Sequence, residues 1–250
     1  MSFSKIVKSG FKTALLIAVA TVGLQAHAVA GPPVAYVRIC DAYGQGFFNI
    51  PGTDTCIRTS AGVQVGYGGT TTNFNTMPAF DVHGSSAVYG VNGMALFGVT
   101  NTGLAVGPRV QLFGGNMGGS SFYSFSGGTY DVTTKSTFAA DLVAQYKPAW
   151  SSNVSFRGFV GIADTRSQTE FNVIRTFAPA LVGSDTSNNV GFTAGLGVNV
   201  YIPSGFTGVS LTGEVRYVGG TANYSIPGSV GTHRDSVLGT LGAEYSFTAK

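Results

Sequence analysis

The sequence predicts an all-β protein, a transmembrane antiparallel up-and-down β-barrel of eight strands. Three observations carry this prediction. The chain begins with an export signal, and it is 44% hydrophobic but only 10% charged, without an apolar run after residue 30 that is long enough for a membrane helix. It also contains eight segments in which apolar and polar residues alternate. Lipid forces every backbone group to be hydrogen-bonded internally, so an exported membrane chain without apolar helices is typically a closed barrel.

The export signal occupies the first 30 residues. Three lysines precede an apolar run over residues 14–24, and small residues follow up to Ala30. A positive start, a short hydrophobic stretch and an Ala-x-Ala exit are typical of a cleaved signal peptide. The run is shorter than the about 20 residues of a membrane-spanning helix, which argues against a retained anchor. We expect cleavage after Ala30, with Ala28 as the alternative.

Removal of this signal changes the charge balance. The chain has 14 Lys and Arg against 11 Asp and Glu, and the signal carries three lysines and no acid. The remainder is therefore neutral, and the basic isoelectric point reflects the signal alone. Because no basic patch with interleaved aromatics occurs, nucleic acid is excluded as a partner. A charged fraction of 10% is also far below the roughly 25% of soluble domains, which argues against a soluble β-sandwich.

Eight segments alternate in the way that barrel strands require. A tilted strand crosses the membrane in about 9–11 residues, with apolar side chains outward and small or polar ones inward. The segments are 57–67, 87–99, 104–112, 138–147, 154–163, 190–202, 209–218 and 237–247. The sixth is the most regular, since Val190, Leu196 and Val200 share one face and Gly191 and Asn199 the other. Segment 87–99 is the least regular and fits either register.

The connections between these segments alternate in length. Short turns are expected at 100–103, 148–153 and 203–208, and long connections at 68–86, 113–137, 164–189 and 219–236. Outer-membrane barrels have short periplasmic turns and longer extracellular loops. An even number of strands then places both ends of the barrel on the periplasmic side. The expected division is a signal peptide at 1–30, a periplasmic segment at 31–56 and the barrel at 57–250.

Aromatic residues near the ends of the segments predict interfacial girdles. We expect a periplasmic girdle of Tyr146, Trp150, Tyr201, Phe206 and Phe247, and an outer girdle of Tyr67 and Tyr217.

Polar and charged residues fill the predicted inner face. The expected lumen-lining side chains are Arg58, Gln64, Arg109, Gln111, Asp141, Gln145, Arg157, Asn199, Glu214, Arg216 and Glu244. Charges at membrane depth must be paired or hydrated. An eight-stranded barrel has an interior that side chains just fill, which favours an ion-paired, mostly plugged lumen. A narrow water-filled path lined by the same groups is the alternative.

Cys40 and Cys56 are the only cysteines in the chain. In an exported protein such a pair predicts a structural disulfide, here closing the N-terminal segment just before the first strand. A redox or metal role is less favoured, because the sequence has no Cys-x-x-Cys and no histidine near either cysteine.

Chemistry-bearing motifs are scarce. After the signal two histidines remain, each two residues from an acid, in Asp81-Val82-His83 and His233-Arg234-Asp235. Such a pair could serve general base catalysis in a barrel enzyme. There is no Gly-x-Ser-x-Gly motif and no metal-ligand cluster, so we expect no catalytic residues, no cofactor and no metal.

The stretch YVRICDAYGQGFFNIPGTDTCIR, residues 36–58, resembles the N-terminal block of the alphaproteobacterial, rhizobial-type outer-membrane porins. In that family a Cys-Asp-Ala-Tyr-Gly start, an aromatic pair and Ile-Pro-Gly-Thr-Asp-Thr-Cys lead into the first strand. The C-terminal GAEYSF, with Gly242, Tyr245 and Phe247, resembles the terminal-strand signal that the barrel-assembly machinery recognises. Family members form aqueous pores of about 16 strands, so this chain would be an unusually short member.

The resemblance implies a porin of the Gram-negative outer membrane that passes small hydrophilic solutes or ions by passive diffusion. Lipid and lipopolysaccharide would surround it, and the barrel-assembly machinery would insert it. The alternative is a closed structural or adhesive barrel without an open pore. Complete pairing of arginines with acids would favour the closed barrel, and a continuous path lined by Gly and Ser would favour the pore. An enzyme is not expected, and the oligomeric state is left open.

Overall fold

The computed structural model describes residues 40–50, 53, 55–74, 80–99, 102–123, 128–151, 153–173, 181–202, 208–222 and 232–247. The predicted signal peptide lies outside these residues. Within them, a short 3-10 helix η1 (Asp41–Tyr43) and a two-residue strand β1 (Phe48–Asn49) precede eight long strands. The long strands are β2 (Cys56–Phe74), β3 (Phe80–Gly98), β4 (Leu104–Tyr123), β5 (Gly128–Tyr146), β6 (Val154–Val173), β7 (Leu181–Tyr201), β8 (Val209–Ala222) and β9 (Thr232–Phe247).

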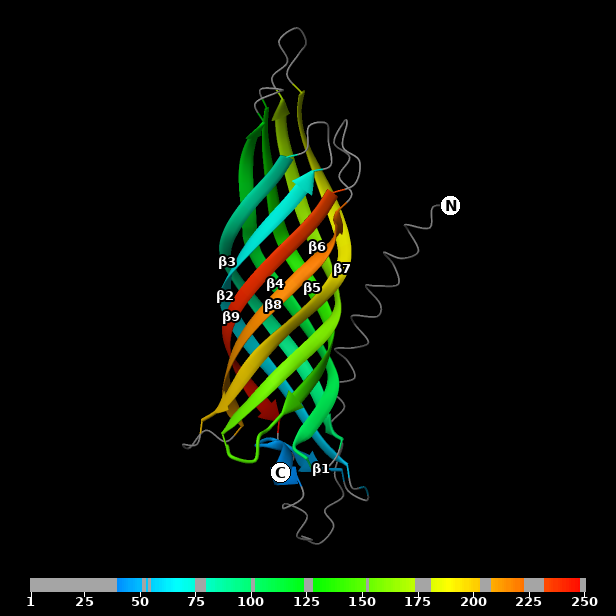
Figure 1. Cartoon of the computed structure of the whole chain (residues 1–250), viewed down its shortest axis with the longest axis vertical. Helices are drawn as coiled ribbons and strands as arrows, with labels where there is room; N and C mark the ends of the chain where they lie inside the picture. Colours follow the sequence, from blue (N-terminus) through cyan, green and yellow to red (C-terminus); the bar gives the residue numbers. More distant parts are fainter. Residues whose placement is uncertain are drawn as a thin grey trace, which may run out of the picture. The chain divides into compact units, whose positions relative to one another are not determined.

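Strands β2 to β9 form a closed antiparallel barrel (Figure 1). Each long strand pairs with the next along the chain, and pairing of β2 with β9 closes the sheet. Closure leaves no exposed sheet edge at membrane depth, which is the condition for a sheet to cross a bilayer. The predicted fold class, an eight-stranded up-and-down barrel, is confirmed.

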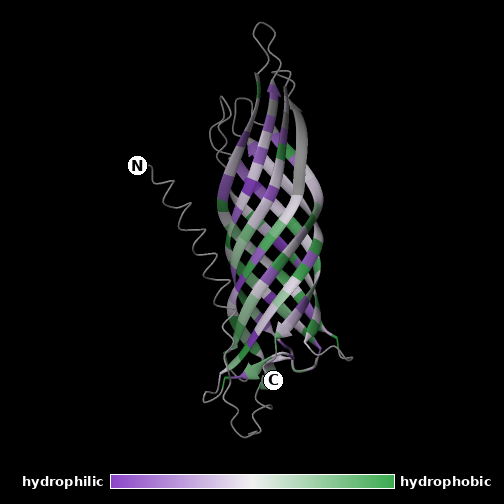
Figure 2. Ribbon diagram, turned by 180° about the vertical axis from the view of Figure 1, so that it is seen from behind, coloured by the Kyte–Doolittle hydropathy of each residue, from purple (hydrophilic) through white to green (hydrophobic). Residues whose placement is uncertain are grey.

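An apolar band covers the outside of the barrel at the end that carries the short turns (Figure 2). The outward side chains there are large and exposed, as for Leu196 at 72% and Leu241 at 71%. In water such exposure would be unfavourable, whereas lipid accepts it. The alternating pattern of the sequence therefore marks the part of each strand that lies in the membrane.

The strands run farther than their predicted segments at the opposite, extracellular end. β2 continues from residue 67 to Phe74, and β7 begins at Leu181 rather than at 190. Much of the four predicted long connections is thus paired sheet. The outward residues there are polar, such as Thr71 and Asn73, because they face water. The alternation of apolar and polar residues stops at the membrane surface. The backbone hydrogen bonds between strands do not require apolar side chains, so the strands continue beyond it.

The barrel wall divides into two four-stranded halves near its extracellular end. The β3–β4 ladder ends at Val88↔Gly115 and the β7–β8 ladder at Gly191↔Gly220. The neighbouring β2–β3 and β6–β7 ladders continue to their hairpin ends. Beyond these points the paired strands are β8-β9-β2-β3 on one side and β4-β5-β6-β7 on the other.

The structure settles the register of segment 87–99. Val88, Met94 and Leu96 are buried inside the barrel, and Tyr89 and Phe97 are exposed on its outside. The sequence pattern was ambiguous because both faces of this strand carry apolar residues.

One expected girdle residue faces the other way. Tyr146, Trp150 and Phe247 are exposed as a periplasmic girdle requires, and Tyr67 is exposed at the outer one. Tyr201 is instead 1% exposed, so its assignment to the girdle was wrong. It follows the inward residue Asn199 by two positions, and strand alternation therefore turns it into the barrel. Phe206 lies outside the described residues.

Candidate functional site in the barrel interior

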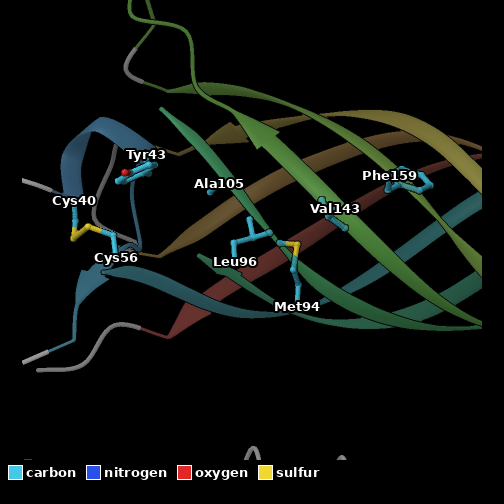
Figure 3. Close-up of a cluster of buried hydrophobic side chains, with 8 residues drawn as sticks. All are labelled: Cys40, Tyr43, Cys56, Met94, Leu96, Ala105, Val143 and Phe159. Atoms are coloured by element: carbon cyan, nitrogen blue, oxygen red, sulfur yellow. A yellow bond between two sulfur atoms is a disulfide. The ribbon is translucent and has the colours of Figure 1, made fainter. Parts of the chain in front are cut away.

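A disulfide-closed cap occupies the periplasmic end of the barrel. Cys40 and Cys56 form the predicted disulfide, which is confirmed, with Cα atoms 5.6 Å apart. The two cysteines are 2% and 1% exposed. They pack in one buried cluster, which comprises Cys40, Tyr43, Cys56, Met94, Leu96, Ala105, Val143 and Phe159. Figure 3 shows the disulfide and Tyr43 where β2 begins, and the other members of the cluster on the barrel strands.

Glycines allow the cap to approach the wall closely. A Cβ on Gly98 of β3 would lie 2.5 Å from the Tyr43 ring, so the ring rests directly on the glycine. Gly46 has a positive φ of 86°, and a Cβ there would lie 2.6 Å from the Cβ of Ser246. Only glycine satisfies both demands at Gly46, a left-handed backbone and contact with β9. We call residues 40–50 together with the disulfide the cap.

Next to the cap lies a first group of buried charges. Arg58 donates to Glu244 at 2.6 Å, and Arg157 binds the same carboxylate with two hydrogen bonds of 2.7 and 2.9 Å. Gln145 accepts from Arg157 at 3.0 Å, and the Tyr201 hydroxyl accepts from Arg58. The carboxylate of Glu244 is therefore shared by two guanidinium groups that come from different strands.

A second group lies beside the first. Arg109 binds Glu214 at 2.5 Å and Asp141 at 3.1 Å, and Arg216 binds Asp141 at 2.7 Å. The ring of Phe159 lies under both arginines, with ring-centre distances of 4.1 Å to Arg109 and 4.5 Å to Arg216. Such cation–π contacts are strongest between desolvated groups, and Arg109 and Arg216 are each 2% exposed.

The two groups are joined into one network. Arg157 of the first group lies 4.0 Å from Glu214 of the second. The interior ion-pair network is thus a continuous chain of seven charged residues, in the order Arg58, Glu244, Arg157, Glu214, Arg109, Asp141 and Arg216. All are at most 7% exposed. Each carboxylate meets two guanidinium groups, which offsets the large desolvation penalty of burying charge.

The remaining predicted lumen residues are also buried inside the barrel, but they differ in their contacts. Gln145 and Gln111 accept hydrogen bonds from network arginines. Gln64 accepts from Thr240 at 3.4 Å. The side chain of Asn199 has no hydrogen-bond partner among the described residues. The structure therefore brings together nine of the eleven, and Gln64 and Asn199 stand apart from the network.

Sequence reasoning missed several residues that complete the interior. Tyr201 and Phe159 contact the network arginines. The alternation of segment 190–202 already places Tyr201 on the inward face with Asn199, although Tyr201 was assigned to the girdle. Phe159 was not assigned to either face, and its spacing of two from the inward Arg157 is the signal that could have identified it. Arg234 lay within a predicted loop. It is 4% exposed, and its guanidinium contacts Thr70, Ser167 and Thr134, which lie on three other strands.

An apolar layer also crosses the interior. Its buried members come from five strands and form a separate cluster, which comprises Val88, Ala139, Ala163, Val218 and Leu238. The interior is therefore polar and apolar in layers along the strands, and not polar throughout.

The two histidine–acid pairs lie on the outer face. His233 approaches Asp235 at 3.2 Å, and Thr71 lies 3.1 Å from His83 Nδ1, all on exposed or half-exposed strand positions. Among the described residues, His, Cys, Asp and Glu form no group of three that could hold a metal ion. Within the described ranges, no helix is long and apolar enough to cross a membrane.

The closed sheet, its outer apolar band and its charged interior define an outer-membrane β-barrel of porin-like type. Its outward apolar side chains contact the membrane lipid. A family model described as the porin subfamily matches residues 27–92. The resemblance to alphaproteobacterial porins is confirmed for this N-terminal portion of the chain.

The curated relatives agree with the family model over short segments. The porin Omp2a of Brucella ovis is 54% identical over 50 residues, which are 18% of this chain and 14% of that protein. Outer membrane protein IIIA of Rhizobium leguminosarum bv. viciae is 69% identical over 26 residues, 10% of this chain and 7% of that protein. The matches thus span about a seventh or less of these relatives' lengths.

Solved structures also align with the chain. The attachment invasion locus protein Ail of Yersinia pestis, in complex with a heparin analogue, aligns with 76% of this chain and 99% of its own, at 12% identity and a TM-score of 0.36. The outer membrane protease OmpT from Escherichia coli aligns with 76% of this chain and 97% of its own, at 11% identity and a TM-score of 0.39.

Proposed function

We propose that this chain is a closed outer-membrane barrel with a structural role, and that its lumen does not pass hydrophilic solutes. The interior ion-pair network carries this proposal. Its seven side chains come from six of the eight long strands, so the network bridges the lumen and does not merely line it. In a barrel of this size, such side chains fill the space that a solute would need.

Two further features support closure. The cap packs against the periplasmic end of the wall through Tyr43 and Gly46. The apolar layer around Val88 and Leu238 lies between the network and the hydroxyl-rich extracellular part of the interior. A hydrated ion would have to pass the cap, the ion-pair network and the apolar layer in turn. At the apolar layer it would also lose its hydration shell.

Single-channel recording of the folded protein in a planar bilayer tests the proposal. We expect no discrete conductance steps from the wild type. Steps should occur in a variant that opens the cap, the network and the apolar layer together, Arg157→Ser/Glu244→Ser/Tyr43→Ala/Leu238→Ser. Ser236→Ala, a small change at another buried polar position, serves as the matched control and should stay silent. Discrete steps from the wild type would overturn the closed barrel.

The second candidate is passive diffusion of small hydrophilic solutes or ions, as in a porin. The match of residues 27–92 to the porin subfamily favours it. So do buried polar atoms that have no partner among the described residues, such as Gln64 Nε2 and Asn92 Oδ1, because water can satisfy them. Swelling of protein-loaded liposomes in a small sugar, together with wild-type conductance steps, would establish this function in place of the first.

We further propose that the chain is not an enzyme and that the barrel-assembly machinery recognises its last strand. The curated porin relatives support the first point. The second rests on Gly242, Tyr245 and Phe247 of β9. Tyr245 and Phe247 are exposed on the outer face, with ring centres 5.3 Å apart, and are thus accessible to a partner.

A further inference from the structure

Two exposed cations lie side by side on the outer face of the barrel. The structure describes eight lysine and arginine side chains. Five are buried inside the barrel, namely Arg58, Arg109, Arg157, Arg216 and Arg234. Lys147 is half-buried just after β5 at the periplasmic end, and only Lys135 and Arg166 are exposed. On the described part of the outer wall, the exposed Lys and Arg side chains therefore lie at one site, formed by Lys135 and Arg166.

A β-bulge creates this neighbourhood. In the β5–β6 ladder Thr134 pairs with Ser167 and Ser136 pairs with Arg166, with a register shift between the two pairs. Lys135 is the extra residue of the bulge. Thr134 and Thr137 both point inward, so Lys135 and Ser136 together occupy the outer side, opposite Arg166. Bulges commonly re-aim a side chain in this way.

The pair lies at the edge of the apolar band. Toward the periplasm, the outward neighbours on the same strands include Phe138 and Ile162, and Ile162 is 62% exposed. Toward the extracellular end they are the polar Thr133 and Gln168. This boundary is the level at which the headgroups of the outer leaflet meet the protein.

Neither cation has a partner in the part of the chain that the structure describes. Lys135 and Arg166 form no hydrogen bond or ion pair with any described residue. Arg166 pairs across the sheet with Ser136 and Asn188, both neutral groups able to hydrogen-bond. Asp164 lies two residues away on the same face, without an ion pair to Arg166. Two adjacent like charges without a counter-ion attract an anion to the site.

We propose that Lys135 and Arg166 bind the phosphate-bearing headgroup of an outer-leaflet glycolipid. Charge complementarity identifies the headgroup, because Arg and Lys are the usual side chains for phosphate. The position identifies a lipid as its source, because the acyl chains would lie on the apolar band directly beneath. A soluble phosphate would gain nothing from that band. This inference is independent of whether the lumen is open.

Native mass spectrometry of the folded full-length barrel tests the proposal, with diphosphoryl lipid A as the probe. A basic residue near an anionic surface contributes about fivefold in affinity, so the Lys135→Gln/Arg166→Gln variant should bind about thirtyfold more weakly. The charge-preserving Lys135→Arg/Arg166→Lys variant should bind nearly as well as wild type. Lys147→Gln, which removes a positive charge at the periplasmic end, serves as the control and should leave binding unchanged.

Two comparisons separate the sources of phosphate. Wild type should bind lipid A without phosphates more weakly than it binds diphosphoryl lipid A. Excess inorganic phosphate should displace little of the bound diphosphoryl lipid A. Both double variants should keep the fold, because Lys135 and Arg166 are exposed. Heat-modifiable gel mobility would verify this. Equal binding of lipid A by wild type and the double Gln variant would overturn the proposal. So would equal binding of phosphorylated and phosphate-free lipid A, or full displacement by inorganic phosphate, which would indicate a soluble anion site.

Discussion

Arg157 on β6 binds Glu244 on β9 through two hydrogen bonds of 2.7 and 2.9 Å, although two strands separate β6 from β9 in the sheet. The pair therefore spans the lumen. Because Glu244 also binds Arg58 at 2.6 Å on β2, one carboxylate connects three strands. The proposed closure of the barrel interior rests on such bridging contacts. Three of the predictions below concern these contacts and the cap, and the fourth concerns the last strand.

Removal of the shared carboxylate should destabilise the barrel more than removal of a complete pair. Glu244→Gln leaves Arg58 without a carboxylate and leaves Arg157 with only Glu214, at 4.0 Å. We expect a loss of roughly 3–5 kcal/mol in the free energy of unfolding. Arg157→Ser/Glu244→Ser removes one charge of each sign and should lose less. Urea unfolding in lipid vesicles measures the loss in each of the two variants. Ser236→Ala, which changes a buried uncharged side chain on β9, is the control. An equal or larger loss in the double variant would contradict the bridging role.

The contact between Tyr43 and Gly98 should behave as a coupled pair. In Gly98→Ala the new methyl group would lie 2.5 Å from the Tyr43 ring, and we expect overpacking to cost roughly 1–3 kcal/mol. The same substitution should be nearly neutral in a Tyr43→Ala background, because the ring is gone. A double-mutant cycle from unfolding curves measures this coupling. Additive effects of the two substitutions would show that the cap does not pack on β3 in the membrane.

Loss of the disulfide should weaken the barrel without preventing insertion. The bond joins residues 16 apart in sequence, and the chain-entropy model assigns it about 3 kcal/mol. Cys40→Ser should lower the midpoint of urea unfolding, and reduction of the wild type should have the same effect. Insertion should persist, because the proposed assembly signal lies on β9. Absence of the variant from the outer membrane fraction would refute this separation.

The terminal aromatic residue should matter for assembly in cells more than for folding in isolation. Phe247 is 47% exposed on the outer face, so Phe247→Ala should change unfolding in vesicles only slightly. It should nevertheless reduce the amount of protein in the outer membrane if the assembly machinery reads this position. Leu241→Ala, on the same face of β9 and 71% exposed, is the matched control. Equal outer-membrane levels of the two variants would remove Phe247 from the proposed signal.

Much of the fold follows from local patterns. Apolar residues alternate along β2, β5, β7 and β9 wherever the wall faces lipid, and this period of two identifies both the strands and their inward faces. The pattern is lost beyond residues such as Tyr67, where the outer face meets water. The extracellular ends of the strands were therefore predicted as loops, because polar outward residues look the same in a strand and in a loop.

The inward charges could be predicted as a set but not as partners. Strand alternation turns Arg157 and Glu244 into the same interior, and their burial at membrane depth requires pairing. Which arginine meets which acid depends on the stagger of the strands around the closed barrel. Arg234 shows the same limit, since its three hydroxyl partners lie on β2, β5 and β6, far away in sequence.

The sequence alone determined the class of the protein. The export signal, the low charge and the apolar period of two are local properties of the chain, and they can be recognised without knowing the fold. It also determined the disulfide, since an exported chain with two cysteines has one simple pairing. Only the tertiary structure decided that the lumen is bridged, that Tyr43 caps one end and that a bulge places Lys135 beside Arg166 on the outside. Each of these relationships joins residues through strand register, bulge position or closure of the sheet, and these are properties of the whole barrel rather than of any segment.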